Sequence, residues 1–335
     1  MNGLLRGLRR IVVLLGIAFL CASCTNAYLP SVADNPWKVL SLPTDAFLSD
    51  VSFSTPSHGW LVGGSSTIME TQDGGNTWEP KPLDLGEQKY RFSSVSFKGD
   101  EGWIVGQPSI LLHTKDGGNS WSQIPLSSKL PGSTNTILAL GPNSAEMTTD
   151  VGAIYRTIDG GQNWKAMVQQ AVGVLRNIER SSDGKYIAVS AKGNFYSVWE
   201  PGQDAWEPHN RNSSRRVQNM GFTPDGRLWM LARGGLVQFT TEQGVEDWQE
   251  AKSPEFATSW GLLHLAYRTP EELWLAGGSG NLLRSTDGGQ TWQKDRAVEN
   301  VPSNLYKIVF LTPEQGFILG QNGTLLKYES PAQSA

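Results

Sequence analysis

A tryptophan recurs at a nearly constant interval along most of the chain, and this period restricts the fold more than any other feature of the sequence. Seven of the thirteen Trp residues follow one another at steps of 41 to 44 residues. They are Trp37, Trp78, Trp121, Trp164, Trp206, Trp248 and Trp292. A period in this range is typical of repeat proteins, in which each unit packs against its neighbours.

Each unit contains four short segments with the composition of β-strands, separated by turn residues. In the first unit these are residues 50–53, 59–63 and 67–71, followed by the segment that begins at Trp78. Apolar and polar residues alternate in the first of them, as in a half-buried strand. Four strands per unit at this period predict the blade of a β-propeller.

The number of units and the two chain ends predict how the ring closes. Innermost strands are expected near Val51, Val95, Leu138, Ile178, Met220, Leu265 and Ile308. The last unit, residues 304–328, supplies only three strands, so the segment from Trp37 to Leu40 is expected to add the fourth and remove the open edges. We therefore predict an all-β fold: a seven-bladed β-propeller of four-stranded antiparallel blades over residues 36–330, with a tail at 331–335.

An Asp-Gly-Gly sequence precedes the repeated Trp in four units, beginning at Asp73, Asp116, Asp159 and Asp287. Calcium or sugar binding is one interpretation of such regular turns. The structural interpretation is favoured, because Gly supplies positive φ angles and an Asp carboxylate accepts hydrogen bonds from backbone N–H groups in the turn. The pattern resembles the Asp-box of sialidases, sortilin-type receptors and xyloglucanases, where it is also a structural turn. The fourth and fifth units lack it.

The first 23 residues have the pattern of an export signal. Arg6, Arg9 and Arg10 precede an apolar run, residues 11–20, that is too short to span a bilayer. The run ends in Cys-Ala-Ser-Cys, which resembles a bacterial lipobox with Cys21 in the place where Leu is usual. We expect a signal peptide at 1–23, a lipidated Cys24 that begins the mature protein, and a linker at 24–35. Ordinary cleavage, for example after Ala27, is the alternative.

Basic residues are concentrated in two neighbouring units. The whole chain has a net charge of −4, yet residues 165–235 contain ten Lys or Arg and six Asp or Glu. We expect Arg176, Arg180, Arg215 and Arg216 to lie close together on one face near the central opening, with Arg211 at the rim. Guanidinium groups suit a carboxylate-rich partner. The alternative is an ordinary charged surface in which Arg180 pairs with Glu179 or Asp183.

Other chemistries find little support in the sequence. His58, His113, His209 and His264 fall in different units without the spacing of metal ligands, so neither a metal nor a cofactor is expected. No Gly-rich phosphate loop or nucleophile motif is present. The negative net charge gives no indication of a nucleic-acid partner, and the chain is expected to be a monomer.

With this register of seven units behind a lipoprotein-type signal, the chain resembles the photosystem II assembly factors of cyanobacteria and chloroplasts. The resemblance extends from Trp37 to Tyr328 and includes residues 59–64 and 287–292. It implies a lipoprotein on the lumenal side of the thylakoid membrane, without enzymatic activity. It also implies binding of the newly made reaction-centre core subunit, with its C-terminal extension, and of other early assembly intermediates. The family's arginine patch corresponds here to Arg176, Arg180, Arg211, Arg215 and Arg216.

Two other functions are considered. A sialidase-like glycoside hydrolase would use three Arg from separate blades, a Tyr nucleophile and an Asp acid. Here the Arg residues are concentrated in two adjacent units, and the Phe/Tyr-Arg-Ile-Pro signature is missing. A general lipid-anchored scaffold that binds proteins or carbohydrates is the other alternative.

Overall fold

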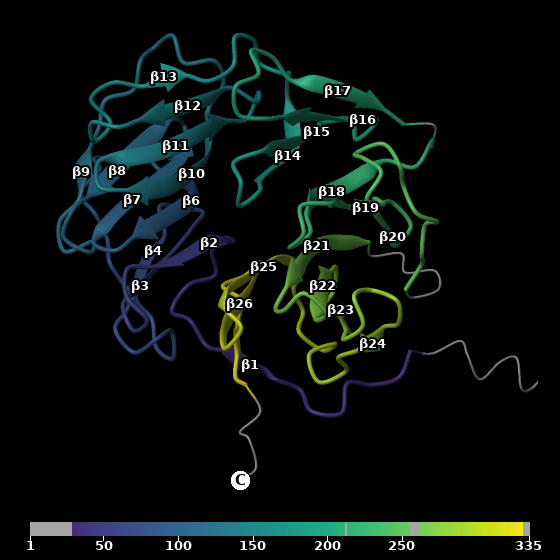
Figure 1. The fold of residues 1–335 in the computed structure, drawn as a ribbon. Helices are drawn as coiled ribbons and strands as arrows, with labels where there is room; N and C mark the ends of the chain where they lie inside the picture. Colours follow the sequence, from purple (N-terminus) through teal and green to yellow (C-terminus); the bar gives the residue numbers. More distant parts are fainter. Residues whose placement is uncertain (1–28, 212, 255–260, 331–335) are drawn as a thin grey trace, which may run out of the picture.

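The computed structural model describes residues 29–211, 213–254 and 261–330. Seven antiparallel sheets are arranged around a central axis, as predicted, and no helix is found among these residues (Figure 1). In each blade the chain runs outward from the axis, so the first strand of a blade is the innermost one. Every expected innermost strand is present.

The strands of the seven blades have the following bounds. Blade one contains β2 (Leu48–Phe53), β3 (Gly59–Gly63), β4 (Ile68–Thr71) and β5 (Glu79–Pro80); blade two contains β6 (Arg91–Lys98), β7 (Glu101–Gln107), β8 (Ile110–Thr114) and β9 (Ser122–Gln123). Blade three contains β10 (Thr134–Gly141), β11 (Ser144–Thr149), β12 (Ile154–Thr157) and β13 (Lys165–Ala166); blade four contains β14 (Leu175–Arg180), β15 (Tyr186–Ser190), β16 (Phe195–Trp199) and β17 (Glu207–Asn210). Blade five contains β18 (Val217–Phe222), β19 (Leu228–Ala232) and β20 (Leu236–Phe239); blade six contains β21 (Leu262–Tyr267), β22 (Leu273–Gly277), β23 (Leu282–Ser285) and β24 (Gln293–Lys294). Blade seven contains β25 (Leu305–Thr312), β26 (Gln315–Gly320) and β27 (Leu325–Tyr328), completed by β1 (Trp37–Leu40).

The N-terminal strand closes the ring, which confirms the prediction. β1 pairs antiparallel with β27 from Trp37 opposite Tyr328 to Leu40 opposite Leu325. The Trp37 ring is 3% exposed and meets the rings of Trp274 and Tyr328 edge-on, at centroid distances of 5.4 and 5.2 Å. Blade five is the irregular one, because its outer strand is reduced to isolated bridges such as that between Thr240 and Trp248.

The Asp-Gly-Gly turns are built on side chain to backbone hydrogen bonds. In the first of them Asp73 accepts bonds from the backbone N–H and the hydroxyl of Thr77, at 2.9 and 2.7 Å. These bonds lower the pKa of Asp73 to about 2. The Thr71 hydroxyl accepts the backbone N–H of Gly75 at 2.9 Å. The side chains of the turn thus bind its own backbone N–H groups, as the structural interpretation expects.

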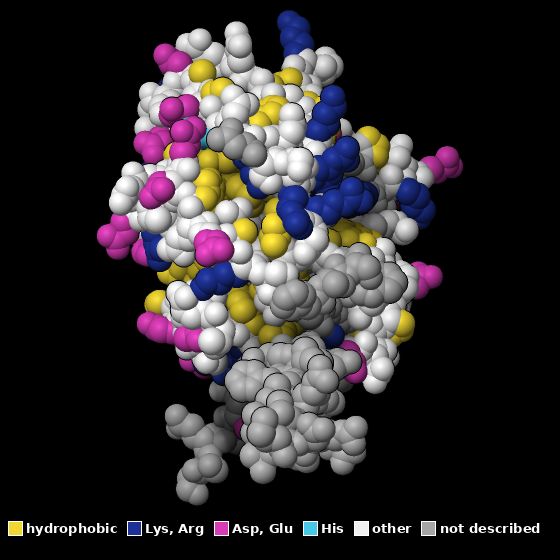
Figure 2. Space-filling view, turned by 90° about the vertical axis from the view of Figure 1, so that its right-hand side faces the viewer, with side chains coloured by type: hydrophobic (Ala, Val, Ile, Leu, Met, Phe, Trp, Pro, Cys, Tyr) yellow, Lys and Arg dark blue, Asp and Glu magenta, His cyan; other side chains and the backbone are white. Residues whose placement is uncertain are grey.

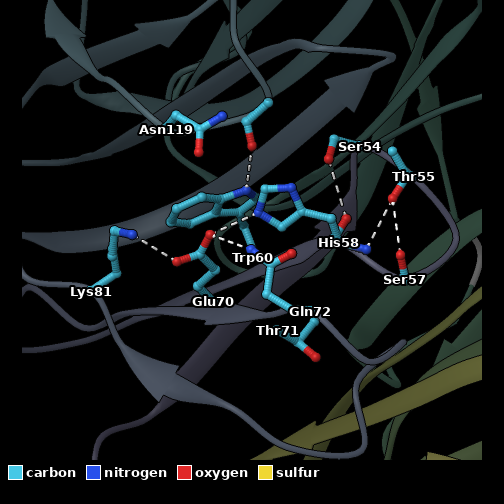
Figure 3. Close-up of polar contacts among 12 residues, drawn as sticks. Ser54, Thr55, Ser57, His58, Trp60, Glu70, Thr71, Gln72, Lys81 and Asn119 are labelled. Atoms are coloured by element: carbon cyan, nitrogen blue, oxygen red, sulfur yellow. Dashed lines mark hydrogen bonds and ion pairs between the residues drawn. The ribbon is translucent and has the colours of Figure 1, made fainter.

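The same turns join neighbouring blades. The indole Nε1 of Trp60, on β3 of blade one, donates to the carbonyl of Gly117 in the turn of blade two at 3.0 Å (Figure 3). A Cβ on Gly118 would lie 2.3 Å from the Trp60 ring. The second Gly of the turn, Gly118, is thus required for close packing as well as for its φ of +96°. Beside this contact, Glu70 accepts hydrogen bonds from His58 and Lys81, both at 2.8 Å (Figure 3).

The expected linker is in part attached to the propeller. Residues 29–35 reach β1 by running past β24 of blade six (Figure 1), and Ser31 forms a parallel bridge with Lys294. The expected signal peptide, Cys24 and the tail at 331–335 lie outside the described residues. Among the residues that the structure describes, no helix has the length and apolarity needed to cross a bilayer.

Candidate functional site

Four of the five expected arginines gather at one end of the boundary between blades four and five. We call Arg176, Arg211, Arg215 and Arg216, together with Lys192 and Arg233, the basic cluster. The innermost strand of each blade begins at this end of the propeller. The turn between the second and third strands of each blade lies at the same end. Figure 2 shows several Lys and Arg side chains gathered on the face of the molecule that it views.

Arg176 connects the two blades. It is the second residue of β14, and its Nη1 donates to Oε1 of Gln218 on β18 at 3.1 Å. Its Nη2 donates to the carbonyl of Ala191 at 3.0 Å, in the turn that carries Lys192. The guanidinium is therefore held at the blade boundary while the side chain stays exposed.

The segment between β17 and β18 supplies three further arginines. Nη1 of Arg211 donates to the carbonyl of Arg215 at 2.6 Å, which holds these two residues together. Burial lowers the pKa of Arg211 from its usual value. Arg215 and Arg216 are exposed, and the carbonyl of Arg216 accepts the backbone N–H of Arg233 at 2.8 Å. Hydrogen bonds therefore link four of the six members of the basic cluster in pairs, Arg211 with Arg215 and Arg216 with Arg233.

The basic cluster carries uncompensated positive charge. In the described part of the chain, no Asp or Glu forms an ion pair with any of its six members, whereas Arg180, Arg227, Arg268 and Arg284 each have a carboxylate partner. Val174 lies beside the cluster with 66% of its surface exposed, and its carbonyl accepts the N–H of Ala191. The surface can thus bind a segment that carries carboxylates and an apolar side chain.

Arg180 lies at the opposite end of β14, four residues and about 13 Å from Arg176. The structure therefore does not bring it together with the other four arginines. Its Nε donates to Oε2 of Glu146 on β11 at 2.7 Å, and its guanidinium lies over the ring of Tyr186, 5.8 Å from the centroid. The expected acid partners were Glu179 and Asp183. The observed one comes from the neighbouring blade.

Arg180 occupies the position on the first strand at which blades one and two carry Phe53 and Phe97, and the opposing strand explains the difference. In blades one and two, Phe53 and Phe97 pair with Gly59 and Gly102, and the Phe ring covers the glycine. In blade four the aromatic residue is on the second strand instead, because Arg180 pairs with Tyr186. The phenol of Tyr186 donates to Glu146 at 3.0 Å, so the carboxylate joins two blades.

A second group of charges lines the central channel. Lys307 of β25 forms an ion pair with Asp50 of β2 at 2.7 Å, and Asp50 also accepts the hydroxyl of Ser94. Burial lowers the pKa of His264 to about 3, with a smaller effect from Lys307. Burial also raises the pKa of Glu179, whose carboxylate lies 4.0 Å from His264. These groups bind one another and hold the inner strands together.

Lys192 and Arg233 are members of the basic cluster that sequence reasoning missed. Both lie in the turn between the second and third strands of a blade. Successive turns of a blade alternate between the two ends of the propeller, so these two turns lie at the same end as the starts of β14 and β18. Counting turns along the repeat would have placed both residues beside Arg176 and Arg216.

Comparisons with known proteins agree on one family. The family model for the photosynthesis system II assembly factor YCF48 matches residues 29–329. The photosystem II assembly lipoprotein Ycf48 of Trichormus variabilis is 63% identical over 325 residues, which cover 97% of this chain and 95% of the relative.

Two solved structures have the same fold as this chain. A structure of YCF48 bound to a D1 peptide superimposes with a TM-score of 0.90 at 61% identity and covers 91% of this chain and 99% of that chain. YCF48 from Cyanidioschyzon merolae superimposes with a TM-score of 0.81 at 41% identity, over 88% of this chain and 99% of that one.

Proposed function

This chain belongs to the YCF48 family of photosystem II assembly factors, and on this basis we propose that its basic cluster binds a carboxylate-bearing segment of the D1 reaction-centre subunit. The observation that carries the proposal is a surface of six cations without an acidic partner among the described residues. The relative whose solved structure holds a D1 peptide is 61% identical, which supports the choice of partner.

The role that follows is that of a non-catalytic assembly factor. The protein would bind the newly made D1 precursor, through its C-terminal extension, and assist early reaction-centre assembly and repair. Exposed arginines at a blade boundary suit this task, because they give affinity for a flexible acidic segment without enclosing it. The paired Arg180 is left out of the binding surface, since Glu146 and Tyr186 already occupy its guanidinium.

Membrane attachment forms the second part of the proposal. Several relatives carry the name lipoprotein. We place the protein on the lumenal side of the thylakoid membrane, held by acyl chains on Cys24. Two or three acyl chains suffice for stable anchoring, at about 0.8 kcal/mol per buried methylene. Cys24→Ala should move the protein into the soluble fraction. A variant that stays on salt-washed membranes would show that something other than lipid holds it.

Capture of D1 from solubilised thylakoid membranes tests the binding site. The test variant is Arg215→Glu with Arg216→Glu. The matched control is Lys129→Glu with Lys165→Glu, which makes the same change in charge at two exposed positions, one in the connection between blades two and three and one on β13 of blade three. Circular dichroism checks that both variants fold. We expect the control to capture D1 as the wild type does and the test variant to lose it. Normal capture by the test variant would contradict the proposed site.

A further inference from the structure

The segment that precedes the propeller extends the sheet of blade six. The N–H of Val32 donates to the carbonyl of Lys294 at 3.0 Å, and the N–H of Lys294 donates to the carbonyl of Pro30 at 2.8 Å. Ser31 and Lys294 form a parallel bridge. Residues 30–32 thus pair with β24, the outermost strand of that blade, in addition to the four strands that the repeat supplies.

Side chains reinforce this attachment. The guanidinium of Arg296 donates to the hydroxyl of Ser31 at 2.8 Å and to the carbonyl of Leu29 at 2.9 Å. Leu29 is partly buried against the apolar cluster between blades five and six, which includes Trp292. Two backbone bonds, two guanidinium bonds and one apolar contact therefore tie residues 29–32 to the outer edge of blade six.

This attachment shortens the tether between the lipid and the propeller. If Cys24 is the acylated residue, as proposed above, only five residue steps separate it from Leu29. A fully extended chain spans at most about 3.6 Å per residue, so the tether reaches no more than about 18 Å. Without the attachment, the free chain would extend to Trp37 and be more than twice as long.

We infer that the outer edge of blade six is the side of the propeller that lies against the membrane. The inference rests on the proposed acylation of Cys24. A compact domain of about 300 residues has a radius of gyration of about 19 Å, so its opposite edges are well over 18 Å apart. In a ring of seven blades, blades two and three lie opposite blade six and are held away from the lipid (Figure 1). Blade five, which carries part of the basic cluster, lies next to the membrane-proximal blade.

Site-specific quenching by lipid tests this orientation. An acylated Cys24 has no free thiol, and Cys21 is removed with the signal, so a single introduced cysteine can be labelled with a fluorophore. Glu299→Cys reports on blade six, because the N–H of Glu299 contacts the carbonyl of Arg296. Gln123→Cys, exposed on β9 of blade two, reports on the opposite edge. Each labelled protein is bound to vesicles that contain a lipid with a nitroxide headgroup.

We expect the Glu299→Cys label to be quenched at least threefold more strongly than the Gln123→Cys label. Inserting ten Gly and Ser residues after Tyr28 lengthens the tether, and Arg296→Ala loosens its attachment, so each should reduce the difference while the protein stays bound. Equal quenching of the two labels on vesicle-bound protein would overturn the orientation alone. A full-length protein found in the soluble fraction would overturn the acylation and the orientation together.

Discussion

The guanidinium of Arg211 donates a 2.6 Å hydrogen bond to the backbone carbonyl of Arg215, so two residues of like charge are held together. No acidic residue in the described part of the chain forms an ion pair with either guanidinium. A surface with such unpaired positive charge is suited to a partner that brings negative charge.

Ring closure by the N-terminal strand leads to the first prediction. Trp37→Ala should lower the free energy of unfolding by about 3–5 kcal/mol, because the ring is 3% exposed and packs between Trp274 and Tyr328. Lys38→Ala on the same strand is the control. Its ion pair with Glu329 is exposed, so the loss should stay below about 1 kcal/mol. Urea unfolding measures both, and equal midpoints would contradict the closure.

Contact between an Asp-box turn and the preceding blade leads to the second prediction. Gly118→Ala should destabilise the fold by about 2–5 kcal/mol, because its Cβ would lie 2.3 Å from the Trp60 ring at a φ of +96°. Gly117→Ala also has a positive φ, but its nearest neighbour is 3.8 Å away, so it should cost only about 1–2 kcal/mol. Thermal unfolding compares the two variants. Equal unfolding temperatures of the two variants would show that the turn does not join the blades.

The pair formed by Arg180 and Glu146 leads to the third prediction. Glu146→Ala should lower stability by roughly 2–3 kcal/mol, because it leaves a mostly buried guanidinium and the Tyr186 hydroxyl without their shared acceptor. D1 capture by the folded variant should be unchanged. Reduced D1 capture by a variant of unchanged stability would show instead that Arg180 belongs to the binding surface.

A pH dependence follows from His264 in the central channel. The N–H of Ile308 donates to its Nδ1 at 3.4 Å, and Lys307 and Glu179 are the charged groups near it. Because the folded pKa is about 3, the unfolded chain takes up a proton near pH 6.5 that the folded chain does not. Above pH 6.5 this histidine is neutral in both states and has no effect on folding. As the pH falls from 6.5 to 3, only the unfolded chain gains the proton, so stability falls by up to about 1.4 kcal/mol per pH unit.

His264→Gln is the variant that tests this effect. Glutamine does not titrate, so the loss of stability between pH 7 and pH 5 should become smaller. Urea midpoints at the two pH values, for wild type and variant, provide the comparison. An unchanged pH dependence in the variant would assign the acid sensitivity to other groups, of which buried His113 is the next candidate.

The propeller itself could be predicted from the sequence, because the period of the Trp residues and the four strand segments of each unit both indicate propeller blades. The position of Trp37 one step before Trp78 showed how the ring closes. These features depend on contacts that repeat in every unit, so each one is supported by several copies in the chain.

The parts that were missed do not repeat. The concentration of arginines in the neighbouring blades four and five predicts that Arg180 lies beside Arg176, although four residues of extended strand separate opposite ends of a blade. Its partner Glu146 is 34 residues away, in another blade. The pairing of residues 30–32 with β24 is parallel and lies outside the repeat, so no periodicity indicates it.

The central claim is that exposed arginines of the basic cluster bind a carboxylate-bearing segment of D1. A labelled peptide from the C-terminal segment of the D1 precursor, titrated with the soluble propeller and followed by fluorescence anisotropy, tests it most directly. Each shielded charge-assisted bond contributes about 1.5–3 kcal/mol, so Arg215→Glu with Arg216→Glu should raise the Kd at least tenfold. Wild-type affinity should fall as salt rises, whereas Lys129→Glu with Lys165→Glu should bind as the wild type does. Equal affinity of the wild type and the Arg215→Glu, Arg216→Glu variant at low salt would contradict the claim.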